Sequence, residues 1–248
     1  HVTQAWRQPG SSFKPFIYSA ALEHGVTPAT MVNDAPLYFS AGVTGGQPWE
    51  PKNYDGKFEG PMTVRTALAK SKNMVSIRIL QTVGASEAQQ WVTRFGFDAD
   101  RHPPYLTMAL GAGSVTPLQM AAGYGVFANG GHYAAPRFIS RIDDHKGRVL
   151  QEYRSPSVQE MPQVIEPRHA LIMSQLLNEV ARSGTAARAQ ATLKRRDLYG
   201  KTGTTNDAVD AWFVGYQPTL VGAVWVGYDN PRNLGSRETG GGLSLPIW

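Results

Sequence analysis

The chain has 248 residues, of which 42% are hydrophobic and 17% charged, so it can bury a core and is not an intrinsically disordered protein. The sequence has no apolar run of about 18 residues, which excludes a transmembrane helix within it, and no cysteine, which excludes disulfides, thiolate catalysis and Cys-based zinc sites. Lys and Arg number 24 against 19 acidic residues, a net charge of +5 that favours an anionic partner or substrate. These basic residues are not clustered with aromatic ones, as nucleic-acid binding would require.

Helical patterns dominate the first half of the chain. A helix is expected to begin at Ser11 and to end near Gly25, because apolar residues recur at helical spacing from Phe13 onward. The segment 33–60 is rich in Gly, Pro, Asn and Asp and is expected to be a loop. Thr116 followed by Pro117 is typical of a helix N-terminus. Further helices are expected over 63–70, 74–83, 86–95 and 116–129.

Strand patterns dominate the last quarter of the chain. Before them, 136–153 alternates like an edge hairpin with its turn at Lys146-Gly147, and 166–182 has the apolar face of a helix. Strands are then expected over 199–205, 211–216 and 220–228. A helical first part followed by an antiparallel meander predicts an α+β or three-layer αβα fold rather than a doubly wound one.

A Ser-x-x-Lys motif, Ser11-Ser12-Phe13-Lys14, lies at the start of the first expected helix. Residues three apart share a helix face, so the Ser11 hydroxyl and the Lys14 amine are expected to meet. A serine hydroxyl needs an adjacent base to become a nucleophile, and lysine can be that base where burial or a nearby cation keeps it neutral. The helix N-terminus would present backbone N–H groups to a developing oxyanion.

A Ser-x-Asn motif, Ser71-Lys72-Asn73, follows the expected helix 63–70. Ser71 is a candidate proton relay, and the Asn73 amide is a candidate partner for a substrate amide. Ser-x-x-Lys and Ser-x-Asn would each arise by chance about half a time in a chain of this composition. Neither motif is therefore informative by itself.

The third motif, Lys201-Thr202-Gly203-Thr204, lies on an expected strand. A cation and two hydroxyls suit a carboxylate, and Gly203 is expected to let an extended ligand lie against the backbone. Lys-Thr-Gly would arise by chance only about 0.06 times. All three motifs together come to about one chance in a hundred, and their order reduces this about sixfold, so the combination is informative.

These motifs resemble those of the serine penicillin-recognising enzymes, and the likeness extends along essentially the whole chain. It is nearest to the transpeptidase domain of class A penicillin-binding proteins, in the Gram-negative penicillin-binding protein 1A branch. The resemblance implies the transpeptidase-like αβα fold, with an antiparallel sheet and a helical subdomain. The similar stretches are 7–16, 49–56, 67–73, 109–114, 201–207 and 238–248.

The start of the chain suggests a piece of a longer protein. It begins at His1 without an initiator methionine or a signal peptide, and Ser11 follows almost at once. The resemblance implies that residues 1–248 are a transpeptidase core incomplete at both ends, without a glycosyltransferase domain or membrane anchor. The longer protein would act at the periplasmic face of the inner membrane.

The implied activity is that of a serine D,D-transpeptidase that cross-links peptidoglycan. Ser11 would form the acyl-enzyme as terminal D-Ala leaves, with Lys14 as base, Ser71 as proton relay and Asn73 as the fourth catalytic residue. The implied partners are stem peptides, as D-Ala-D-Ala donor and amine acceptor, and β-lactam antibiotics, which would acylate Ser11. The resemblance implies no cofactor, no metal and no nucleic acid.

The same resemblance assigns the binding groups. Lys201, Thr202, Gly203 and Thr204 would bind the substrate, and Lys201, Thr202 and Thr204 would hold its terminal carboxylate. The backbone N–H groups of Ser11 and Thr204 would form the oxyanion hole.

Two other functions on this scaffold stay open. One is a hydrolase, a D,D-carboxypeptidase or β-lactamase in which water removes the acyl group, although no residue is an evident base for that step. The other is a non-catalytic β-lactam sensor.

The six histidines lack metal-binding spacing and are expected at the surface or in turns. Trp212 and Trp225 are expected in the sheet core. Trp49 and Tyr54 are open candidates for lining a groove.

Overall fold

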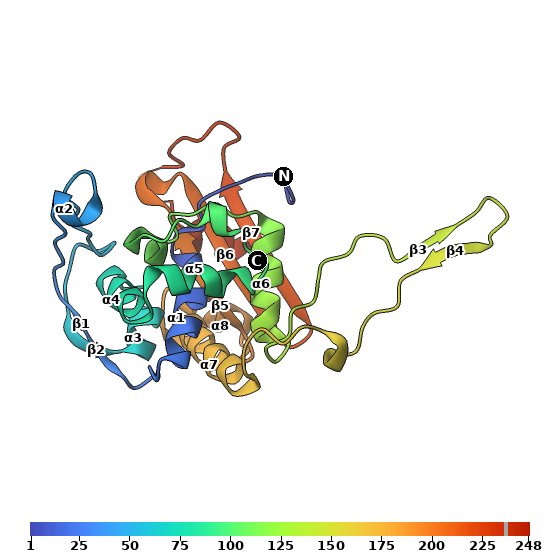
Figure 1. The fold of residues 1–248 in the computed structure, drawn as a ribbon, viewed down its shortest axis with the longest axis horizontal. Helices are drawn as coiled ribbons and strands as arrows, with labels where there is room; N and C mark the ends of the chain where they lie inside the picture. Colours follow the sequence, from blue (N-terminus) through green and yellow to red (C-terminus); the bar gives the residue numbers. More distant parts are fainter. Residues whose placement is uncertain (236–237) are drawn as a thin grey trace.

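The computed structural model describes residues 1–235 and 238–248, and its framework is a three-stranded antiparallel sheet covered by helices (Figure 1). The strands form the meander that the sequence predicts, in the order β5-β6-β7. Alternating aromatic and β-branched side chains suit β6 to a position between two layers, and it is buried along almost its whole length. The strands are β5 (Tyr199–Thr204), β6 (Asp210–Gln217) and β7 (Leu220–Gly227).

The two faces of this sheet contact different parts of the chain. Tyr216 points to the helical side, where its hydroxyl lies 2.7 Å from that of Ser174 on α7 (Pro167–Ser183). Phe213 points the other way and packs edge-on against Trp248, with ring centroids 5.0 Å apart. The sheet is therefore the middle of three layers, which confirms the predicted three-layer fold.

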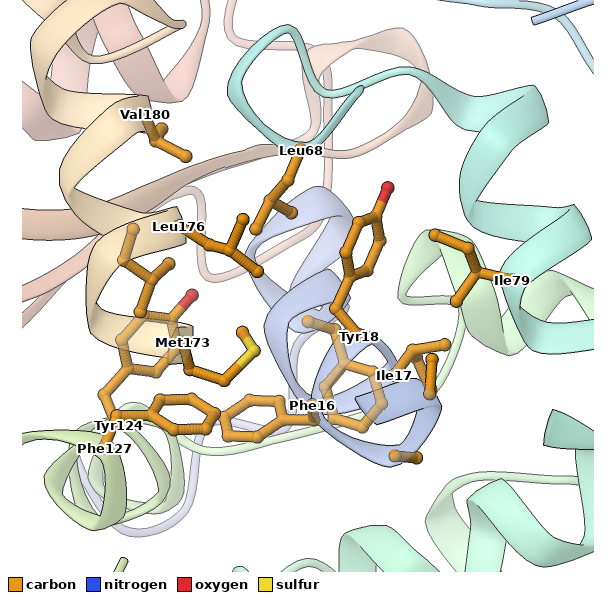
Figure 2. Close-up of a cluster of buried hydrophobic side chains, with 14 of the residues drawn as sticks. Phe16, Ile17, Tyr18, Leu68, Ile79, Tyr124, Phe127, Met173, Leu176 and Val180 are labelled. Carbon is orange, nitrogen blue, oxygen red and sulfur yellow. The ribbon is translucent and has the colours of Figure 1, made fainter. Parts of the chain in front are cut away.

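Helix α1 (Lys14–Glu23) runs through the middle of the helical part and is buried on all sides except at its last residue. Phe16 lies in an aromatic cluster, with its ring centroid 5.1 Å from that of Phe95 and 5.6 Å from that of Phe127. Figure 2 shows side chains of α1, α6 and α7 meeting in this core. A 3-10 turn, η1 (Gly10–Phe13), leads directly into α1, so the predicted helix start near Ser11 is confirmed.

The other helices surround α1 and the sheet. The helices predicted over 63–70, 74–83, 86–95, 116–129 and 166–182 are confirmed, each within about two residues at its ends. They are α3 (Val64–Ala69), α4 (Asn73–Val83), α5 (Ala85–Thr93), α6 (Pro117–Ala128) and α7. Shorter elements are α2 (Ala41–Thr44), η2 (Ala99–Arg101), η3 (Leu106–Leu110), η4 (Val158–Glu160), η5 (Asn206–Ala208), η6 (Gly240–Ser244) and α9 (Leu245–Ile247). Within the described ranges no helix is both long and apolar enough to cross a bilayer.

Two predictions of secondary structure were wrong. The segment 33–60 is mostly loop, but its ends belong to a two-stranded sheet of β1 (Met31–Asp34) and β2 (Gly60–Thr63). These strands are short and pair across about thirty residues, so no local pattern reveals them. Helix α8 (Ala187–Leu193) was also missed: it is short and follows only three residues after α7, and no cap or apolar face predicts it.

The predicted hairpin forms, but it does not join the main sheet. β3 (Arg141–Asp143) and β4 (Val149–Glu152) pair with each other at the end of a long excursion that leaves the body of the molecule (Figure 1). Every residue of both strands is exposed. We call residues 136–155, which include this hairpin, the arm.

Candidate active site

A groove of about 1080 Å³ lies between the helical part and the edge of the main sheet. All three motifs reach it. Its walls include Ser11 from η1, Ser71 and Asn73 from the α3–α4 junction, and Thr202 and Thr204 from β5. Trp49 and Tyr54 also line it, which answers the question that the sequence left open.

Close backbone packing places Ser11 beside β5. Gly10 has a positive φ of +54°, and a Cβ there would lie 2.8 Å from the Thr204 carbonyl oxygen. Gly111 packs against the same turn, where a Cβ would lie 2.0 Å from the Gly10 carbonyl oxygen. Only glycine fits such contacts, so the two glycines bring the backbones of Ser11 and Thr204 together.

Lys14 is fully buried beneath the groove. Its Nζ donates to the Ser71 carbonyl oxygen at 2.8 Å and to Asn73 Oδ1 at 2.8 Å, and it lies 3.3 Å from Ser71 Oγ. Burial, followed by the positive charge of Lys201, holds the pKa of Lys14 well below its ordinary value, although Asp34 opposes this. Burial and a nearby cation are the two conditions under which the sequence analysis expects a lysine to act as a base.

Lys201 lies on the helical face of β5. The side chain is fully buried and does not line the groove. Its Nζ donates to Ser71 Oγ at 2.9 Å and to the Thr202 carbonyl oxygen at 3.1 Å. Burial lowers the pKa of Lys201 to about 7. Neighbouring strand residues face opposite sides, so Thr202 and Thr204 reach the groove while Lys201 points away from it.

Gly203 lies where β5 packs closely against η1. A Cβ there would lie 2.3 Å from the Pro9 carbonyl oxygen and 2.9 Å from Ser12 Oγ, so this glycine makes room for η1. The hydroxyl of Thr202 lies 2.6 Å from that of Thr185. The Thr204 hydroxyl accepts a hydrogen bond from the Gly240 N–H at 3.1 Å.

The Asn73 side chain is held by the protein at both ends. Its Oδ1 accepts from Lys14, and its Nδ2 donates to the Lys52 carbonyl oxygen at 2.8 Å. The amide is therefore fixed at the groove wall with one remaining N–H for a ligand.

The model of the penicillin-binding protein transpeptidase domain matches residues 1–247. The chain belongs to this family. Its relatives include penicillin-binding protein 1A of Neisseria flavescens, 52% identical over 249 residues that cover all of this chain and 31% of that protein. Penicillin-binding protein 1A of Pseudomonas aeruginosa is 43% identical, over 99% of this chain and 35% of that protein. The chain thus spans about a third of the length of the curated relatives it matches.

Solved structures of penicillin-binding proteins have the same fold. Penicillin-binding protein 1A from Haemophilus influenzae superposes with a TM-score of 0.90 at 35% identity, over 97% of this chain and 41% of that one. The PonA1 protein from Mycobacterium tuberculosis, solved in complex with penicillin V, gives a TM-score of 0.84 at 28% identity, over all of this chain and 68% of that one. These likenesses confirm the family resemblance and the transpeptidase-like fold.

Several residues near the groove were missed or misplaced by the sequence reasoning. Lys72, Asp34 and Asn53 form a buried polar cluster behind Ser71, and nothing in the motif Ser-x-Asn specifies its middle residue. His102, which was expected at the surface or in a turn, closes the η2 turn, but it is buried and stacks on Phe13 with ring centroids 4.6 Å apart. Across residues 1–235 and 238–248, no cluster of three or more His, Asp or Glu side chains is arranged to hold a metal ion.

Proposed function

We propose that the chain is a serine D,D-transpeptidase domain in which Ser11 carries the acyl group. The observation that carries this proposal is the environment of Lys14. Its amine is buried, its three neighbours are a carbonyl, a hydroxyl and an amide rather than a carboxylate, and its pKa is lowered. A neutral lysine amine one helical turn from a serine at a groove is the base that such a nucleophile needs.

In the first half of the reaction, Ser11 Oγ attacks the carbonyl carbon between two terminal D-alanines. Lys14 Nζ takes the hydroxyl proton, and the proton then reaches the departing D-Ala nitrogen through the Ser71 hydroxyl. Ser71 suits this relay because its Oγ lies 3.3 Å from Lys14 Nζ and 2.9 Å from Lys201 Nζ. The backbone N–H groups of Ser11 and Thr204 stabilise the oxyanion.

Substrate binding falls to the groove face of β5. The hydroxyls of Thr202 and Thr204 donate to the terminal carboxylate, and Lys201 contributes its positive charge from behind the strand. In the second half of the reaction, an acceptor amine attacks the acyl carbonyl and releases Ser11. A β-lactam ring opens on Ser11 in the same way as the donor peptide bond. In this proposal the longer protein works at the periplasmic face of the inner membrane.

Covalent labelling tests the proposal. The chain is incubated with a fluorescent penicillin, and the labelled peptide is identified by mass spectrometry. We expect the label on Ser11, none on Ser11→Ala, and acylation slowed by about a hundredfold or more in Lys14→Met, the scale of a lost general base. Lys57→Met is the matched control, because Lys57 is exposed and outside the groove. Label on Ser11→Ala, or normal acylation of Lys14→Met, would contradict these roles.

A second measurement separates transpeptidation from the two alternatives. Stem peptides that end in D-Ala-D-Ala are supplied together with peptides that carry a free acceptor amine. Cross-linked dimers with release of D-Ala are the expected product. Shortened monomers alone would indicate a hydrolase, and stable penicillin labelling without any peptide product would indicate a sensor.

A further inference from the structure

The middle residue of the Ser71-Lys72-Asn73 motif is a lysine with almost no exposed surface. Lys72 Nζ lies 2.9 Å from Glu59 Oε1, 3.1 Å from Asp55 Oδ2 and 3.5 Å from Asp34 Oδ2. A buried ammonium group is tolerated only where such partners compensate for its lost hydration. The chain therefore anchors this position strongly, although Lys72 does not itself contact Lys14.

Asp34 extends the anchor to the start of α4. It is fully buried, and its Oδ1 accepts from Asn53 Nδ2 at 2.7 Å while its Oδ2 accepts from the Glu59 N–H at 3.0 Å. Asn53 Oδ1 in turn accepts from the Asn73 N–H at 2.8 Å. Asn53 thus accepts a hydrogen bond from an N–H group at the first turn of α4. The N-cap residue of this helix makes no such side-chain hydrogen bond itself.

Ser71 needs such an anchor because its backbone is in an uncommon conformation. Its φ of +58° lies in the left-handed region, which serine seldom adopts. The N–H of Ser71 bonds to the Leu68 carbonyl at 3.0 Å and that of Lys72 to the Ala67 carbonyl at 2.9 Å, which is the Schellman ending of α3. Glycine usually occupies this left-handed position. Here the conformation turns both oxygens of Ser71 toward Lys14.

We propose that Lys72, Asp34 and Asn53, which we call the brace, are positioning residues that hold Ser71 and Asn73 where Lys14 and Lys201 bind them. This inference rests on the proposed function of Ser11 and Lys14. The brace touches no reacting atom. It acts by fixing the backbone that follows Ser71 and by placing the carboxylate of Asp34 near the catalytic amine.

The first test removes both buried charges together, so that neither is left unpaired. In Asp34→Asn/Lys72→Met we expect the second-order rate of acylation by fluorescent penicillin to fall by about tenfold or more, since small displacements of reacting groups cost rate steeply. Lys57→Met changes the same residue type at an exposed position of the same loop and should stay within about twofold of the unmodified chain. A folded double variant that acylates at the unmodified rate would overturn the brace.

The second test uses pH, because a purely structural role would not move a pH profile. The charged groups that act on Lys14 are Lys201 on β5 and Asp34 on β1, and Ser71 and Asn73 beside it are neutral. Asp34→Asn removes the negative charge, which lowers the pKa of Lys14 further. When the acylation rate is measured as a function of pH, the acidic limb of the curve should then move to lower pH by about half a unit or more. An unmoved limb would contradict the brace.

Glu59→Gln is the matched charge control for that experiment. Glu59 also contacts Lys72, but at the exposed end of the cluster. We expect acylation about threefold slower with an unmoved acidic limb. If the double variant does not fold, the acylation rate of Glu59→Gln decides whether the brace positions the site. A rate equal to that of the unmodified chain would show that the cluster is purely structural and would overturn the brace.

One readout needs no reaction at all. The titration of Lys14, followed by 13C NMR of labelled lysine side chains and assigned with Lys14→Arg, should shift to lower pH in Asp34→Asn. If the unmodified chain is not labelled at Ser11, the proposed function fails, and this titration still decides whether Asp34 acts on Lys14. A titration equal to that of the unmodified chain would overturn the brace.

Discussion

At the scale of single residues, the turn that carries Ser11 rests on a buried histidine. His102 stacks on Phe13 with an interplanar angle of 9°, and neither of its ring nitrogens has a hydrogen-bond partner among the described residues. Gly113 makes room for the ring, because a Cβ there would lie 2.2 Å from His102 Nδ1. Burial lowers the pKa of His102 to about 4, so the ring is neutral in the folded protein.

This histidine predicts a loss of stability in mild acid. Between pH 6.5 and about 4 the unfolded chain protonates His102 and the folded chain does not, so the free energy of unfolding falls as the pH falls through this window. The loss is about 3 kcal/mol at most. We expect His102→Phe, measured by urea unfolding at pH 7.5 and 4.5, to lose less stability in acid than the unmodified chain. An equal loss would contradict the prediction, and His145→Phe, at an exposed site in the arm, is the control.

Positions within one element could be predicted from the sequence, and contacts between distant elements could not. Ser11 and Lys14 are three residues apart and η1 leads directly into α1, so local periodicity was enough to place them on adjoining turns. The burial of Lys201 depends on which face of β5 packs inward, and the motif does not specify that. The brace joins positions 34, 53 and 72, and contacts so far apart in the chain leave no local pattern.

At the scale of elements, the start of α6 shows how local chemistry fixes a helix that supports the sheet. The Gln119 N–H donates to Thr116 Oγ1 at 3.2 Å, and the Thr116 N–H donates to Gln119 Oε1 at 3.1 Å. This capping box, with Pro117 as the first helical residue, confirms the helix start predicted from Thr116-Pro117. Helices with such signals could be predicted from sequence, whereas β1 and β2, which lack them, could not.

Removal of the cap should destabilise the chain measurably. In Thr116→Ala we expect the free energy of unfolding to fall by about 1 kcal/mol, since the Gln119 N–H at the helix start loses its partner. Urea unfolding monitored by tryptophan fluorescence measures the change. Ser40→Ala is the control, because Ser40 precedes α2 without making a side-chain cap. An equal effect of the two substitutions would show that the capping box adds nothing.

At the scale of the whole molecule, the arm stands apart from a compact body. Within the part of the chain that the structure describes, its strands pair only with each other, and two-stranded sheets gain little stability by themselves. The core, in contrast, joins residues on both sides of the arm, since α1, α6, α7 and the main sheet contact one another. The integrity of the groove therefore does not depend on an unbroken arm.

This arrangement predicts that a cut in the arm is harmless. Brief trypsin treatment should cleave first within 136–155, where Arg141, Lys146 and Arg148 are exposed. The two fragments should stay associated on gel filtration and be labelled by fluorescent penicillin at a rate within about twofold of the intact chain. Separation of the fragments or loss of labelling would contradict the independence of the arm.

The left-handed backbone at Ser71 has a consequence for how this domain can vary. The backbone at this position favours glycine by about 1 kcal/mol, whereas the proposed proton relay requires a hydroxyl. Glycine in place of Ser71 would therefore relieve the backbone strain at the end of α3, but it would also remove the hydroxyl that the proposed proton relay needs. Stability and reactivity are opposed at this residue, and selection for a more robust fold would act here against selection for turnover.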